Sequence, residues 1–103
     1  MIQSIADETF RQEVLESPVP VLVDFWAPWC GPCQTMAPAL AEFEQRHGAR
    51  IKVVKVNIDH DPEHAMQLSV RSVPTLMLFE KGAVTKSVAG AQTLARLEAA
   101  FAV

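Results

Sequence analysis

Two apolar runs constrain the fold of this 103-residue chain more than any other feature: Val21–Trp26 and residues 51–58. Runs of this kind are typical of strands that are buried on both faces of a sheet. Between them, apolar residues recur at helical spacing from Cys33 until Gly48, with Pro38 expected to kink the helix. A helix between two such strands is the crossover that parallel strands require. The sequence therefore predicts an α/β fold.

Shorter patterns supply the other elements. Residues 2–5 predict an edge strand, and Asp7 is expected to cap a helix that ends before residues 17–20. An aspartate before Pro62 is expected to cap a short helix, with Pro62 at its first helical position. A hairpin over residues 75–88 and a final helix capped by Thr93 follow. We expect a central mixed sheet of about five strands, flanked by about four helices, in a single domain over residues 1–103.

Both cysteines lie in Trp29-Cys30-Gly31-Pro32-Cys33, between the first buried strand and the long helix. Cysteines three positions apart on a helix share one face, so their sulfurs can bond. Cys30 should lie at the helix N-terminus, where free N–H groups stabilise a thiolate. We expect Cys30 to be exposed and Cys33 to face the sheet. An inert structural pair is the weaker alternative, because a chain that is 50% hydrophobic can form a core without disulfides.

Asp24 is the anomaly in the first buried strand, where its neighbours are apolar. One interpretation is a carboxylate that is hydrogen-bonded for structural reasons. The other is a proton acceptor for Cys33, with a pKa that desolvation raises. The residues alone favour the structural interpretation.

Charge and hydropathy exclude some classes of partner. The net charge of −3 comes from interspersed acids and bases, with no basic run that could bind nucleic acid. No stretch approaches the roughly 20 apolar residues of a membrane span, and the N-terminus lacks a leader pattern, so we expect a cytoplasmic protein. In that compartment a Cys-x-x-Cys pair is more often catalytic or metal-binding than structural.

Zinc binding is the main alternative, because Cys30 and Cys33 with His60 and His64 supply Cys₂His₂ ligands. The 26 residues between Cys33 and His60 argue against it, since they are about twice the usual interval of a zinc finger. We therefore expect no metal. A second alternative is a docking or accessory subunit in which the cysteines are incidental.

Several motifs along the chain resemble the thioredoxin family in order and spacing. They are Trp26-Ala27-Pro28-Trp29-Cys30-Gly31-Pro32-Cys33, Pro38, Val73-Pro74-Thr75 and Val88-Ala89-Gly90. The resemblance implies a thioredoxin fold and a protein-disulfide reductase that serves thiol redox homeostasis and donates electrons to reductive enzymes. It implies no bound cofactor, with electrons from NADPH through a thioredoxin reductase. The expected partners are that reductase and disulfide-containing target proteins, and we expect a monomer.

The resemblance also implies roles for individual residues. Cys30 would attack a substrate disulfide and Cys33 would resolve the mixed disulfide. Asp24 would lie beneath Cys33 as proton acceptor, near Lys55, and Pro74 would be a cis-proline that faces the site. The remaining residues would tune or surround the pair: Gly31 and Pro32 between the cysteines, and a docking surface of Trp29, Ile58, Val73, Ala89 and Gly90.

Gln34 and Ser72 depart from the family pattern, the latter where glycine is also common. Gln34 stands where the family often has lysine or arginine, which removes a positive charge beside the thiols. The direction of exchange depends on the reduction potential and the compartment, so an oxidising or isomerising role is the alternative to reduction.

Overall fold

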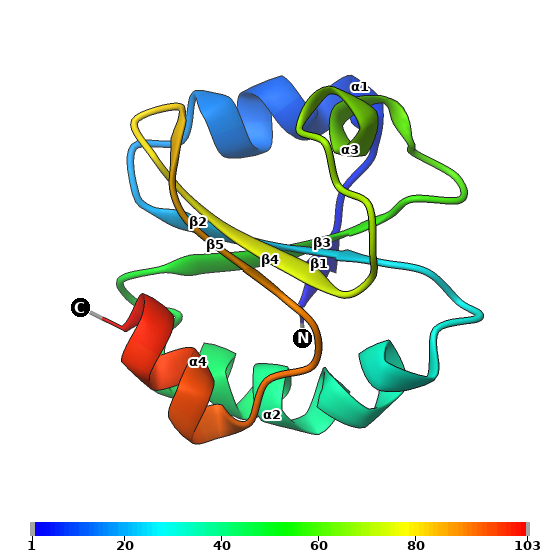
Figure 1. Ribbon diagram of the computed structural model, residues 1–103. Helices are drawn as coiled ribbons and strands as arrows, with labels where there is room; N and C mark the ends of the chain where they lie inside the picture. Colours follow the sequence, from blue (N-terminus) through cyan, green and yellow to red (C-terminus); the bar gives the residue numbers. More distant parts are fainter. Residues whose placement is uncertain (1, 103) are drawn as a thin grey trace.

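The computed structural model describes residues 2–102, which form one five-stranded sheet in the order β1-β3-β2-β4-β5 (Figure 1). The strands are β1 (Gln3–Ser4), β2 (Val21–Trp26), β3 (Lys52–Asn57), β4 (Thr75–Glu80) and β5 (Ala83–Ala89). The strands β1, β3 and β2 are parallel, whereas β4 is antiparallel to both β2 and β5. The predicted mixed sheet is confirmed, and β1 is shorter than the expected edge strand.

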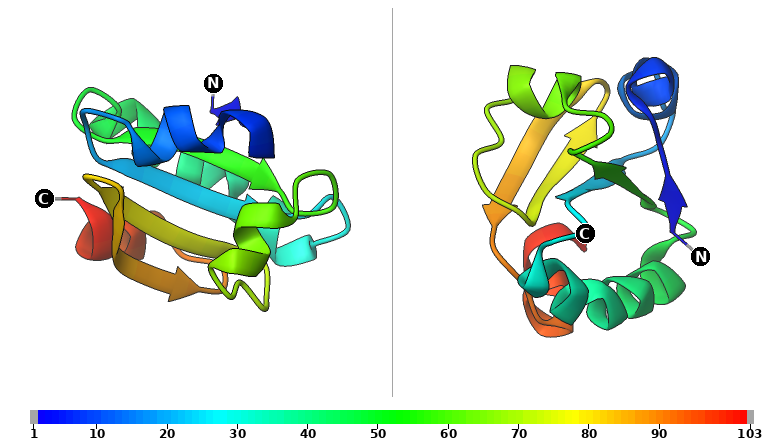
Figure 2. Two further views of the ribbon diagram at one scale, coloured as in Figure 1. Left: turned by 90° about the horizontal axis from the view of Figure 1, so that it is seen from above. Right: turned by 90° about the vertical axis from the view of Figure 1, so that its right-hand side faces the viewer.

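Helices cover both faces of the sheet. They are α1 (Asp7–Phe10), continued by the π-helix η1 (Arg11–Leu15), α2 (Gly31–His47), α3 (Glu63–Gln67) and α4 (Leu94–Phe101). The helices α1 and α3 lie on one face, and α2 and α4 lie on the other (Figures 1 and 2). No helix within residues 2–102 is long and apolar enough to cross a bilayer.

The central strand β2 contributes side chains to a core on each face. Val23 and Phe25 belong to the core under α1 and α3, with Phe10. Leu22 belongs to the core under α2 and α4, with Phe43. Successive strand side chains point to opposite faces, so a central strand covered twice must be apolar at nearly every position. This double burial explains the run that the sequence shows.

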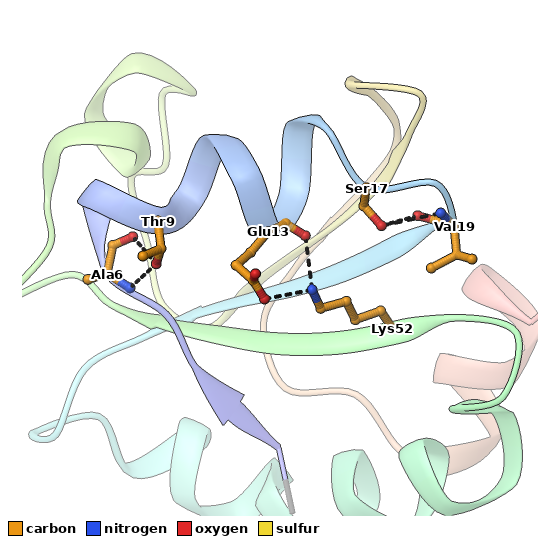
Figure 3. A network of polar contacts seen from close by, with 6 residues as sticks. All are labelled: Ala6, Thr9, Glu13, Ser17, Val19 and Lys52. Carbon is orange, nitrogen blue, oxygen red and sulfur yellow. Dashed lines mark hydrogen bonds and ion pairs between the residues drawn. The ribbon is translucent and has the colours of Figure 1, made fainter.

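The first helix is held to the sheet by a lysine from β3. Its second half is π-helical, with Glu16 N–H donating to the carbonyl oxygen of Arg11 at 2.9 Å. Lys52 Nζ donates to the carbonyl oxygen of Glu13 at 3.2 Å and to its Oε1 at 2.8 Å (Figure 3). At the start of the helix, Ala6 is the N-cap and its N–H donates to Thr9 Oγ1 at 3.3 Å. The expectation that Asp7 caps its own helix is therefore wrong.

The two helices on this face exchange caps. Asp7 accepts the first two N–H groups of α3, from Glu63 to Oδ2 at 3.2 Å and from His64 to Oδ1 at 3.3 Å. In return, Asp61 Oδ1 accepts the N–H of Asp7 at 3.0 Å. Pro62 occupies the N-cap of α3 rather than its first helical position, and it offers no side-chain acceptor. The predicted local cap of the short helix is wrong because a distant aspartate provides it.

The other predicted boundaries hold. The helix α2 runs without interruption through Pro38 and ends at Gly48, and Thr93 Oγ1 accepts the N–H of Arg96 at 3.2 Å at the start of α4. Lys81 and Gly82 form the tip of the hairpin with φ of 52° and 82°. Positive φ at both central positions is typical of the type I′ turn, which suits the twist of the strands.

Asp7 should make folding stability depend on pH. Burial acts to raise its pKa, but hydrogen bonds from His64 and Glu63 outweigh burial and hold the pKa below its ordinary value of 3.8. Its stabilising contribution is therefore complete above that value and is lost as the pH falls through the lowered pKa. We expect Asp7→Asn to lower the free energy of unfolding by about 1–2 kcal/mol near pH 7. This difference should shrink toward about pH 2.5, as measured by urea denaturation.

Glu8→Gln is the matched control, because Glu8 is an exposed acid in the same helical turn. This substitution should change the free energy of unfolding little at every pH. A difference between Asp7→Asn and the unmodified protein that stays constant with pH would contradict the assignment.

Candidate active site

The cysteine pair occupies the N-terminus of α2. Cys30 is the N-cap, with φ of −88° and ψ of 108°, and its Sγ accepts the N–H of Cys33 at 3.1 Å. The two sulfurs are joined in a disulfide, with the Cα atoms 5.3 Å apart. The free N–H groups of a first helical turn favour negative charge, so this geometry stabilises a thiolate on Cys30 after reduction.

The expectation that Cys30 is exposed is wrong, whereas Cys33 is buried as expected. Cys30 is 3% exposed and Cys33 is 6% exposed, so the first cysteine is no more accessible than the second in the disulfide form. Ala27, Ile58 and Val73 pack around the pair. Cys30 Sγ also lies 3.6 Å from the carbonyl oxygen of Val73. The two cysteines differ instead in their place on α2, because Cys30 is the N-cap and Cys33 lies within the first turn.

A pocket of about 140 Å³ lies beneath the second cysteine. Asp24 and Trp26 reach it from β2, where they lie two positions apart and so on one face of the sheet. Lys55 stands opposite Asp24 in the β2–β3 register, and its Nζ lies 5.0 Å from the centroid of the Trp26 ring. The residues that line the pocket are Ile2, Asp24, Trp26, Cys33, Gln34, Ala37, Leu40 and Lys55.

The surroundings of Asp24 shift the pKa of its carboxyl group. Burial raises its pKa to about 7, and the charge of Lys55 acts in the opposite direction. Asp24 Oδ1 and Trp26 Nε1 are buried, and neither has a hydrogen-bond partner in the described chain. Burial of an ionised carboxylate without such partners is costly, so the neutral form is favoured. The pocket therefore holds a carboxyl group that can exchange a proton near neutral pH beside Cys33.

Three further segments lie near the pair. Trp29 is 68% exposed, and its Nε1 donates to Asp59 Oδ1 at 3.2 Å. The Val73-Pro74 peptide bond is cis, and the N–H of Gly90 donates to the carbonyl oxygen of Pro74 at 2.8 Å. Ala89 lies opposite Thr75 in the β4–β5 register, so it too is next to this bend.

Two polar residues near the pair have contacts that the sequence did not reveal. Gln34 is exposed, and its Nε2 donates to the carbonyl oxygen of Pro28 at 3.2 Å, across the turn that precedes Cys30. Asp59 is the partner of Trp29. Its place directly after Ile58, at the end of a parallel strand, is the only sequence signal for it.

The four residues of the zinc alternative, Cys30, Cys33, His60 and His64, do not form one cluster. His64 Nδ1 lies 3.0 Å from Asp7 Oδ1, on the α1 face. Within residues 2–102, no three His, Cys, Asp or Glu side chains form a cluster that could hold a metal ion.

The sequence profile named Thioredoxin matches residues 1–102. The chain belongs to the thioredoxin family. It is 56% identical over 87 residues to thioredoxin 1 of Nostoc sp., covering 84% of this chain and 81% of that protein. Thioredoxin 1 of Synechococcus elongatus is 54% identical over 88 residues, which cover 85% of this chain and 82% of that protein. Thioredoxin of Streptomyces clavuligerus is 45% identical over 97 residues, which cover 94% of this chain and 90% of that protein.

The thioredoxin resemblance inferred from the motifs is confirmed, together with the fold and the class of activity. The protein is a thioredoxin-type disulfide oxidoreductase that acts in cell redox homeostasis, and Cys30 and Cys33 are its redox pair. The redox group is this disulfide, and the family indicates no bound cofactor.

Removal of Asp24 should stabilise the fold in a pH-dependent way. Its folded-state pKa of about 7 lies above the ordinary 3.8, so the folded chain loses stability as the pH rises between these values. The gain from Asp24→Ala should therefore grow from about pH 4 to pH 7, by about 2–4 kcal/mol, and then level off. Chemical denaturation at each pH measures it.

The cost of the missing side-chain volume is the same at every pH and cancels in this comparison. Asp59→Ala removes an exposed aspartate instead, and its effect should stay flat across the same range. A gain from Asp24→Ala that does not change with pH would refute a buried, neutral Asp24.

Proposed function

We propose that this protein reduces disulfide bonds of other proteins, with Cys30 as the attacking thiolate and Cys33 as the resolving thiol. The observation that carries the proposal is the N-cap position of Cys30, whose sulfur accepts a helix N–H from Cys33. A sulfur in this position is the better thiolate of the two and also the better leaving group.

The exchange transfers two electrons and two protons. Cys30 thiolate attacks one sulfur of the substrate disulfide, which forms a mixed disulfide and releases the first substrate thiolate. Cys33 then loses its proton and attacks Cys30 Sγ, which forms the Cys30–Cys33 disulfide and releases the second substrate thiolate. One substrate thiolate takes up the proton that Cys33 releases, and the other takes up a proton from solvent, equal to the one that Cys30 released when it ionised. The substrate is thereby reduced and the pair is oxidised.

We assign Asp24 as the group that accepts the Cys33 proton. The carboxyl group lines the same pocket as Cys33, and its pKa of about 7 suits exchange at neutral pH. Lys55 supports this role because its positive charge favours the ionised carboxylate. Gly31 and Pro32 fix the spacing of the two cysteines, and their exposed positions leave the approach to the pair open.

We propose that target proteins dock on the surface formed by Trp29, Ile58, Val73, Ala89 and Gly90. Exposure of the Trp29 ring and the packing of Ile58 and Val73 beside the cysteines support this surface. An extended substrate segment would lie along Val73-Pro74, where backbone groups just before the start of β4 can pair with it.

The supply of electrons follows from the family. We propose that a thioredoxin reductase uses NADPH to re-reduce the disulfide, and that the protein serves targets in the cytoplasm. Residues 1–103 would act as a single domain and as a monomer. Few large apolar side chains are exposed in the described residues, which supports the monomer.

Cys33→Ser should trap substrates. Without a resolving thiol, the mixed disulfide between Cys30 and the substrate cannot be released, so it should accumulate to near one per protein. Reduced Cys33→Ser is mixed with insulin whose disulfide bonds are intact. Non-reducing electrophoresis with mass spectrometry then identifies the adduct. Cys30→Ser is the matched control and should form little adduct. Equal trapping by both variants would reject Cys30 as the attacking thiolate and Cys33 as the resolving thiol. Retention of biological function by Cys30→Ser would instead favour an accessory subunit.

Asp24→Ala should slow turnover near neutral pH. Loss of a general base typically costs about 100-fold or more, and we expect at least a tenfold loss here, because solvent can replace part of the function. Insulin reduction is measured from about pH 6 to pH 9, and the deficit should narrow at the alkaline end as Cys33 ionises unaided. Asp24→Asn should behave alike, because an amide cannot accept the proton. Normal turnover in both variants would exclude the assigned role.

A further inference from the structure

Residues 58–73, which we call the α3 segment, connect β3 to β4. These strands are not neighbours in the sheet, because β2 lies between them. Ile58 and Val73 stand at the two ends of the segment, and both pack against the cysteines. The segment therefore joins two halves of the proposed docking surface, and its placement determines how those halves face one substrate.

The N–H of Ile58 holds the start of the α3 segment to β2, because it donates to the carbonyl oxygen of Trp26 at 3.0 Å. Few hydrogen bonds fix the part between the two ends. Within residues 2–102, only two residues outside positions 57–75, Asp7 and Trp29, form hydrogen bonds with residues 59–72. Trp29 contributes one bond, to Asp59. Asp7 takes part in four, which are its N–H to Asp61, its carboxylate with the N–H groups of Glu63 and His64, and its carboxylate with the His64 ring.

His64 completes this attachment. Its Nδ1 lies 3.0 Å from Asp7 Oδ1, and because an ionised carboxylate has no proton to give, the imidazole is the donor. The ring also stacks on Phe10, with centroids 4.2 Å apart and an interplanar angle of 19°. Phe10 is buried in the core against Phe79. A helix of five residues has little stability of its own, so its tertiary contacts determine where α3 lies. Ala65 is buried in the same core and Leu68 and Val70 pack against it, while Asp7 and His64 supply the polar part of the attachment.

We propose that Asp7 and His64 are positioning residues for protein substrates, because their contact fixes α3 and so aligns Ile58 with Val73. The proposal rests on the docking surface proposed above. It concerns recognition rather than chemistry, since Asp7 and His64 lie on the α1 face, whereas the pocket of Asp24 and Cys33 is lined by α2. A small disulfide that needs no docking surface should not depend on them.

Two variants of similar size separate the hydrogen bond from the stacked ring. His64→Leu removes both, whereas His64→Asn removes the ring but keeps an amide donor near the position of Nδ1. Each protein is reduced, freed of reductant, and mixed with increasing insulin in single-turnover experiments. Oxidised glutathione serves as the small disulfide, and thermal melts compare the stability of the variants.

We expect His64→Leu to raise the half-saturating insulin concentration roughly threefold to tenfold, with an unchanged limiting rate and an unchanged rate with glutathione. His64→Asn should stay within about twofold of the unmodified protein. Should His64→Leu fail to fold, His64→Phe keeps a ring on Phe10 without the donor, and the same rise is expected.

Equal half-saturating concentrations for His64→Leu and the unmodified protein would overturn the positioning role alone. Equal slowing with insulin and with glutathione would also overturn it, because the contact would then serve general stability. If the unmodified protein reduced glutathione but showed no saturation with insulin, the docking surface itself would be wrong and the positioning role with it.

Discussion

Burial of β2 on both faces is the constraint on which the rest of the structure depends. A central strand that is covered by helices on each side excludes water from nearly every side chain it carries, and in β2 only Trp26, its last residue, is partly exposed. In such a strand, an acid is stable only when it is neutral or well partnered. Asp24 meets this condition by a raised pKa, and the strand that carries it leads directly to the cysteines. The same desolvation that costs stability therefore produces a proton-exchanging group at the redox pair.

Elements with a strong pattern could be predicted from the sequence, and local caps could not. The apolar runs at β2 and β3 and the long periodic helix α2 were found with nearly correct bounds, because burial dictates their composition. The caps of α1 and α3 were misassigned because capping rules use neighbours in sequence. Here Asp7 and Asp61 cap each other's helices across 54 positions, so tertiary contact overrides the local signal.

The redox pair was identified because both cysteines stand in one short motif, whereas the remainder of the site combines distant segments. Lys55 came from the family resemblance alone, since its position opposite Asp24 depends on a strand register that the sequence does not specify. The exposure of Cys30 was misjudged for the same reason. Ile58 and Val73 cover it from the two ends of the connection between β3 and β4.

The attachment of α3 to α1 suggests how one fold can separate chemistry from recognition. The proton-exchanging pocket is formed by β2, β3 and α2, while α3 is held from the other side of the sheet by Asp7 and His64. The pocket and the contacts of Asp7 and His64 share no side chain. They meet at the cysteine pair and at Trp26, whose carbonyl oxygen accepts the N–H of Ile58. On the docking surface that we propose, a change in the α3 contact would therefore alter which proteins bind well without altering the pKa of Asp24 or the N-cap position of Cys30. Because both functions use the same buried sheet as support, neither requires a second domain.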